Sequence, residues 1–137
     1  MKTSFDIDKI VYDLLAGSNV RQLISGGIYY QDDRPDNSQA EDVVINTITM
    51  TQDFLPQIAT SNVNIYVADK QRNIKGKEQI KPNHKRLSEL TKEVLSVLRD
   101  ARIEGLKLIP ESQSILAETN VHQHFCNIRI AWNIQTD

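Results

Sequence analysis

The sequence has almost no cysteine and no long apolar run. Its single cysteine, Cys126, has no partner for a disulfide within the chain, and a chain of 137 residues can bury a core without disulfide or metal. No stretch approaches the roughly 18 apolar residues that span a bilayer. The first residues, MKTSFDIDK, lack the apolar run of a signal peptide. We therefore expect one domain, residues 1–137, without a membrane segment.

The sequence also lacks a large excess of either charge, since the formal net charge is −2. This balance argues against a protein that coats nucleic acid. Motifs of common catalytic and cofactor sites are missing as well: there is no P-loop, no GxGxxG and no G-x-S-x-G. Gly26-Gly27 is therefore interpreted as a tight turn. We expect neither a cofactor nor catalytic activity.

What the sequence does contain is a clear alternation of apolar and polar residues. From Cys126 to Ile134 every second residue is apolar, which is typical of a long strand with one buried face, here spanning 121–134. Trp132 belongs to this apolar set, so we expect its ring to be buried and its indole N–H to find an acceptor. Further strands are expected at 28–30, 42–51, 62–68, 106–109 and 112–118.

Apolar residues at helical spacing predict two longer helices. The first is capped by Ser4 or Asp6 and ended by Gly17. The second has an apolar stripe about five turns long, with Pro82 in its first turn and Gly105 after its end. Both helices have one apolar face, so each is expected to pack on the sheet.

The remaining segments connect these elements. One more helical turn is expected within 19–25, and turns or loops at 31–41, 53–61 and 69–81. The strands at 42–51 and 62–68 are expected to be antiparallel neighbours. The sequence thus predicts an α+β fold, a mostly antiparallel sheet with two helices packed on one face.

The order of these elements, with a few positions within them, resembles a known family. A short amphipathic helix leads through GGIYY and a polar loop with Pro35 into the strand EDVVINTITM. A strand NVNIYV, a long helix and a His-containing final strand follow. Together these segments resemble the tail terminator, or tail completion, family of long-tailed bacteriophages, the minor tail protein U-like proteins. The resemblance covers nearly the whole chain and includes no catalytic motif.

The resemblance implies a structural role in the virion. Members of this family are not enzymes; they form a ring, typically of six subunits, on the head-proximal end of the tail tube. The ring stops tube polymerisation and presents a surface to the head connector, and the genome DNA passes through its hole. The implied partners are copies of the chain itself, the tail tube protein and the connector protein. The implied location is the virion tail, assembled in the host bacterial cytoplasm.

Charge is segregated along the chain in a way that suits such a ring. Residues 32–42 hold five acids against Arg34, and residues 70–86 hold seven cations against Glu78. A head-to-tail ring needs two different and complementary patches on each subunit. We therefore hypothesise that the acidic segment of one subunit meets the basic segment of the next, or of the tube protein. The candidate interface residues are Asp32, Asp33, Asp36, Glu41, Lys70, Arg72, Lys75, Lys77 and Lys81.

Other interpretations of these segments stay open. Both can be ordinary solvated loops. The basic segment can also line the hole or touch phosphates, although it lacks the aromatic residues that stack on single-stranded bases. Asp32, Asp33 and Asp36 do not have the spacing of an EF-hand calcium loop.

Two rival functions come from other features. His122, His124 and Cys126 alternate, so on a strand they share one face and the two imidazoles can bind a metal with a third ligand. This pattern is the basis of one rival, a small metal-dependent hydrolase, but no further ligand can be named from the sequence. The other interpretation is a polar strand start followed by the core at Cys126. The second rival is an adaptor that adds a partner's strand to an exposed sheet edge.

Overall fold

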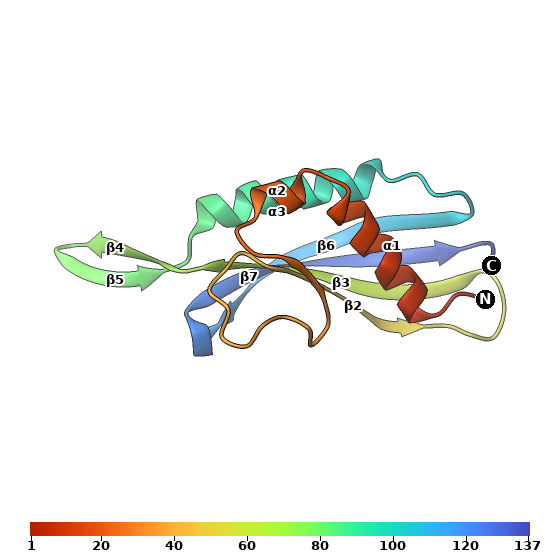
Figure 1. Cartoon of the computed structure of the whole chain (residues 1–137), viewed down its shortest axis with the longest axis horizontal. Helices are drawn as coiled ribbons and strands as arrows, with labels where there is room; N and C mark the ends of the chain where they lie inside the picture. Colours follow the sequence, from red (N-terminus) through yellow and green to blue (C-terminus); the bar gives the residue numbers. More distant parts are fainter.

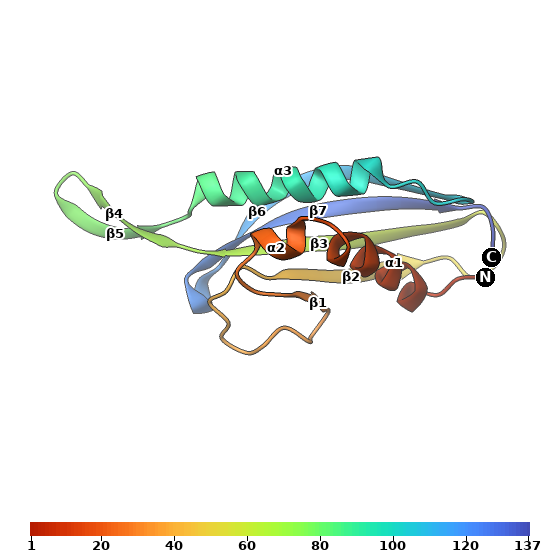
Figure 2. The ribbon, with the colours of Figure 1, turned by 45° about the horizontal axis from the view of Figure 1, so that its top comes forward.

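The computed structural model describes all residues, Met1–Asp137, and has two layers (Figure 1). One layer is a five-stranded sheet. The other consists of α1 (Ser4–Ala16), α2 (Val20–Leu23) and α3 (His84–Asp100), which lie on the same side of the sheet (Figure 2). The predicted α+β class is confirmed. None of the three helices has the length and apolar character that crossing a membrane requires.

The sheet is mixed rather than purely antiparallel. Its order is β1-β2-β3-β7-β6. The first pair, β1 and β2, is parallel, whereas the other three neighbouring pairs are antiparallel. The predicted antiparallel pairing of the strands at 42–51 and 62–68 is thus confirmed. The strand bounds are β1 (Ile28–Tyr30), β2 (Val43–Met50), β3 (Gln57–Ala68), β6 (Leu106–Glu118) and β7 (Gln123–Ile134).

The core lies between the helices and one face of β2, β3 and β7. Alternate residues of β7 from Cys126 onward are buried there, as the sequence predicts. Trp132 is 2% exposed, and its Nε1–H donates to Ser61 Oγ at 2.9 Å. This partner satisfies the indole N–H in the core, so both expectations for Trp132 are confirmed.

Both predicted helices form, and Gly17 is the C-cap of α1, as predicted. The other three ends differ from the prediction. The N-cap of α1 is Thr3, whose side chain and Asp6 together make a capping box. The N-cap of α3 is Asn83, whose Oδ1 accepts from the Arg86 N–H at 3.3 Å, so Pro82 precedes the helix. An amide side chain can accept this orphan N–H and a proline cannot. At its other end α3 stops at Asp100, short of Gly105.

Two of the predicted strands are shorter than the strands in the structure. The expected turn at 53–61 ends early, because β3 already begins at Gln57. The buried Gln57 side chain bonds the backbone N–H and C=O of Lys2, a pairing that sequence alternation does not reveal. The segments 106–109 and 112–118 form one strand, β6, with a register shift near Pro110. An edge strand tolerates proline because only one side of it needs hydrogen bonds.

The prediction of a loop at 69–81 is wrong, because this segment forms a β-hairpin. Its strands are β4 (Lys70–Ile74) and β5 (Lys77–Lys81), which pair only with each other. Lys75 and Gly76 form the turn with φ of 52° and 82°. Two positive φ values are typical of the tight turn that matches the twist of a hairpin. The segment is polar on both faces, so it gave no strand signal.

Candidate interaction surfaces

The hairpin, residues 70–81, projects from one end of the molecule. Figures 1 and 2 show it continuing past the start of α3 along the long axis, away from the two chain termini. Most of its side chains are exposed, including the aliphatic side chain of Ile80. A two-stranded hairpin is marginally stable on its own in water. Its projection therefore makes it a candidate for contact with another molecule.

The strand register gathers cations on one side of this hairpin. Lys70 lies directly opposite Lys81, Arg72 opposite Gln79, and Ile74 opposite Lys77. Because residues two apart share a face, these side chains lie on one side, while Glu78 lies on the other. Like charges directly across a strand pair repel each other. The cationic face, which we define as Lys70, Arg72, Lys77 and Lys81, is therefore suited to an anionic partner.

The acidic loop, residues 31–42, is held against the sheet from within. Asp42 is 1% exposed, and its Oδ2 accepts from Arg34 Nε at 2.8 Å and from Ser38 Oγ at 2.7 Å. The Arg34 guanidinium also donates to Gln123 Oε1 at 2.9 Å and lies 4.0 Å from the centre of the Tyr66 ring. Asp42 thus forms a structural ion pair with Arg34 and does not belong to an exposed acidic surface.

Glu41 is a predicted interface residue that the structure uses inside the chain. Arg86 of α3 donates to both of its carboxylate oxygens, at 2.6 and 2.9 Å. The hydrogen bonds from Arg86 hold the pKa of Glu41 below its ordinary value. The predicted acidic and basic segments therefore meet within one subunit at this point. The role of Glu41 as an intersubunit contact stays a prediction, for a carboxylate that is already paired within the chain.

The other predicted interface residues are exposed, except Lys81. Asp32, Asp33 and Asp36 are exposed on the acidic loop, and their carboxylates take part in no ion pair. On the hairpin, Lys81 is half-buried. The exposed cations of the hairpin are Lys70, Arg72, Lys75 and Lys77. The structure does not bring the acidic loop and the hairpin together, so any pairing between them joins two molecules.

A groove lies between the start of α1 and the start of the acidic loop. We call it the α1 groove; its volume is about 470 Å³. Phe5 at its rim is 81% exposed, and Tyr30 is 36% exposed and stacks on Tyr12 with ring centres 5.2 Å apart. An exposed phenylalanine beside partly exposed tyrosine is typical of a contact surface. The groove is lined by Ser4, Phe5, Asp8, Lys9, Tyr30, Gln31, Asp32 and Thr47.

Two carboxyl groups line this groove without a cation bound to them. Asp8 Oδ1 accepts from Thr47 Oγ1 at 2.6 Å, and partial burial raises the pKa of Asp8 above its ordinary value. Asp32 also lines the groove. Lys9 also lines it, but Lys9 Nζ is 2.7 Å from Asp13 Oδ2. The groove is therefore acidic with aromatic walls.

The structure does not support the predicted common face of His122, His124 and Cys126. His122 precedes β7 and has a left-handed backbone, with φ of 50°. His124 Nδ1 lies 2.7 Å from Asp69 Oδ1, and Cys126 is buried in the core. The turn before β7 removes His122 from the alternation, whereas His124 and Cys126 still alternate within β7. No group of three or more His, Cys, Asp and Glu side chains lies close enough to bind a metal ion.

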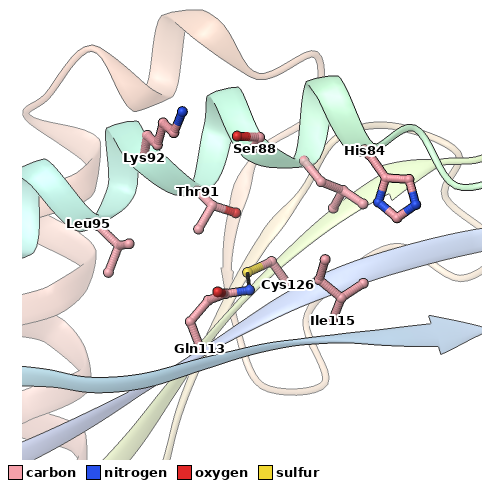
Figure 3. A pocket seen from close by; sticks show the side chains of 9 residues that line it. His84, Ser88, Thr91, Lys92, Leu95, Gln113, Ile115 and Cys126 are labelled. Carbon is pink, nitrogen blue, oxygen red and sulfur yellow. Dashed lines mark hydrogen bonds between the residues drawn. The ribbon is translucent and has the colours of Figure 1, made fainter.

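A second groove, of about 410 Å³, lies between α3 and the edge strand β6 (Figure 3). Thr91 is 8% exposed, and its hydroxyl has no hydrogen-bond partner. Below it Gln113 Nε2 donates to Cys126 Sγ at 3.2 Å. In the outer half of β6, which is the half that ends at Glu118, the side chains of Ile115 and Leu116 are exposed. These features suit the addition of an extended peptide to β6, which is what the adaptor interpretation requires.

Sequence reasoning found the charged segments but missed how the structure uses them. The ion pair of Arg34 and Asp42 joins two residues of one polar loop, and nothing in the pattern distinguishes them from solvated neighbours. The α1 groove depends on the loop folding back near α1, which no local signal predicts. Phe5 gave the one available sequence signal for this groove, because it is an aromatic residue outside the apolar face of an amphipathic helix.

Comparison with known proteins gives no assignment: no family model matches the chain, and no curated protein matches it.

Proposed function

We propose that this protein is a structural component of the head–tail junction of a long-tailed bacteriophage or prophage. Copies join head to tail into a ring, with six subunits expected from the resemblance, on the last layer of the tail tube. The ring ends tube polymerisation and docks to the head connector, and the genome DNA passes through it without sequence-specific contact. Its location is the virion tail, after assembly in the host bacterial cytoplasm.

The observation that carries this proposal is the charge polarity of the molecule. The hairpin holds five cations and one acid, whereas the whole chain has a net charge of −2. The rest of the molecule therefore has an excess of acids, including exposed ones on the acidic loop. A subunit with one cationic projection and an acidic body favours head-to-tail contact over contact between like surfaces.

The test is the mass of the assembly and its dependence on salt. We expect wild-type protein at low ionic strength, alone or with the proposed partner, the tail tube protein, to form rings in native mass spectrometry and negative-stain images. Lys75→Glu with Lys77→Glu is expected to weaken assembly strongly at low salt and less at high salt, because salt screens exposed charges.

The matched control reverses two exposed lysines elsewhere, Lys92→Glu with Lys107→Glu. It makes the same change in net charge and should leave assembly near the wild-type level. If the hairpin variant gives the wild-type ring mass at every salt concentration, the charge pairing is refuted. Zinc-dependent hydrolysis at one bound metal per chain would replace the whole proposal.

A second candidate, the strand-addition adaptor, is favoured by one observation: the exposed outer half of β6 beside the groove that contains Thr91. An adaptor of this kind needs no self-association. A monomer that binds extended peptides and never joins tail tubes would favour it over the ring.

A further inference from the structure

The hairpin and the α1 groove lie toward opposite ends of the molecule. Figure 1 shows the hairpin at one end of the long axis and the start of α1 beside both chain termini at the other. Ser4, Phe5 and Asp8, which line the groove, belong to that first part of α1. A projection at one end and a groove toward the other are the geometry of a heterologous contact that repeats from copy to copy.

The tip of the hairpin is narrow and cationic. Its turn has two residues, Lys75 and Gly76, and Lys77 follows at once. A Cβ built on Gly76 would meet no atom within 4 Å, so nothing in the same chain packs against the tip. Two exposed lysines thus flank a position without a side chain. Such a tip can enter a groove without obstruction by its own backbone.

The α1 groove has the complementary chemistry. Asp8 and Asp32 supply carboxylates that are free of ion pairs, and burial of Asp8 disfavours its negative charge unless a cation approaches. The exposed Phe5 ring and the Tyr30 ring offer apolar surface for the methylene stem of a lysine. A lysine ammonium also interacts favourably with aromatic faces.

We propose, on the basis of the head-to-tail assembly proposed above, that the hairpin tip of one copy binds in the α1 groove of the next. Lys75 and Lys77 lie beside Asp8 and Asp32 in this contact, and their stems pack on Phe5 and Tyr30. In this contact the cationic face of one copy lies along the exposed acidic residues of the acidic loop of the next copy. The occupant of the groove is thus a defined segment of a second copy of this chain.

The test uses two variants whose charges are changed on opposite sides of the proposed contact. The hairpin-reversed variant carries Lys75→Glu and Lys77→Glu. The groove-reversed variant carries Asp8→Asn and Asp32→Lys; the amide oxygen of the introduced asparagine can still accept from the Thr47 hydroxyl. Each variant alone brings like charges together and should raise the protein concentration needed for rings by about ten-fold or more. An equal mixture restores opposite charges at every contact, so it should form rings of alternating copies.

The control is Glu111→Lys, a charge reversal like that at Asp32 but placed on β6 at the opposite edge of the sheet, which should assemble like wild type. Thermal unfolding of each variant verifies that it is folded. If the wild type forms rings but the groove-reversed variant does so equally well, or the mixture does not recover, the docking site is overturned while the ring remains. If the wild type never assembles, alone or on tail tubes, the proposed function itself fails and takes the docking site with it.

Discussion

At the scale of single residues, one chain of hydrogen bonds links the core to the α1 groove. Trp132 Nε1–H donates to Ser61 Oγ, which lies 2.9 Å from Thr47 Oγ1. Thr47 Oγ1 in turn donates to Asp8 Oδ1 at 2.6 Å. Each hydroxyl can donate onward and accept from the previous group. The half-buried Asp8 carboxylate is the terminal acceptor and faces the groove.

This position yields a prediction about pH and stability. Burial raises the pKa of Asp8 in the folded protein above the ordinary 3.8, so its contribution to stability falls as pH rises from that value through the folded pKa. Asp8→Asn keeps the oxygen and removes the charge. Its free energy of unfolding in urea should therefore exceed that of wild type at pH 7, and the difference should vanish below pH 3.8.

The same substitution should weaken ring assembly at pH 7, because in the proposed contact the carboxylate that destabilises the monomer attracts the hairpin of the next copy. Lower stability of Asp8→Asn at pH 7 would mean that the Thr47 bond needs a charged acceptor. That result would contradict the role assigned to burial.

At the scale of elements, the acidic loop keeps its shape because one arginine joins it to the sheet. Arg34 bonds the buried Asp42 and also contacts Gln123 at the start of β7 and the Tyr66 ring of β3. Removing one partner of a buried ion pair leaves an uncompensated charge.

We expect Arg34→Met to cost about 3 kcal/mol of unfolding free energy, measured by urea titration. It should also make the loop a site of rapid proteolysis. Arg72→Met, at an exposed arginine of the hairpin, is the matched control and should change stability by less than about 0.5 kcal/mol. Equal stability of the two variants would show that Arg34 does not anchor the loop.

Elements with one buried face were predictable, and elements without one were not. The apolar file from Cys126 to Ile134 identified β7 and the environment of Trp132, because burial of alternate residues leaves a clear pattern. The hairpin left no such pattern, since both of its faces meet water. The sequence shows that charged residues are concentrated in two segments, but only the folded chain shows that Glu41 is already paired with Arg86.

At the scale of the whole molecule, the structure combines a two-layer body with a projecting cationic hairpin. The body provides an acidic loop and an aromatic groove, and the hairpin provides the complementary charge. In the proposed assembly a subunit of this form associates through two different surfaces, so closure into a ring depends on the angle between them. Electrostatic complementarity sets the register and encounter rate of such contacts more than their affinity.

The most direct test of this account is the mass of the wild-type protein mixed with its proposed partner, the tail tube protein, at low and high salt. The account predicts a closed ring, with six copies expected, that caps each tube at low salt and is lost when Lys75 and Lys77 are both replaced by glutamate. A protein that stays monomeric in the presence of tubes at every salt concentration would contradict it.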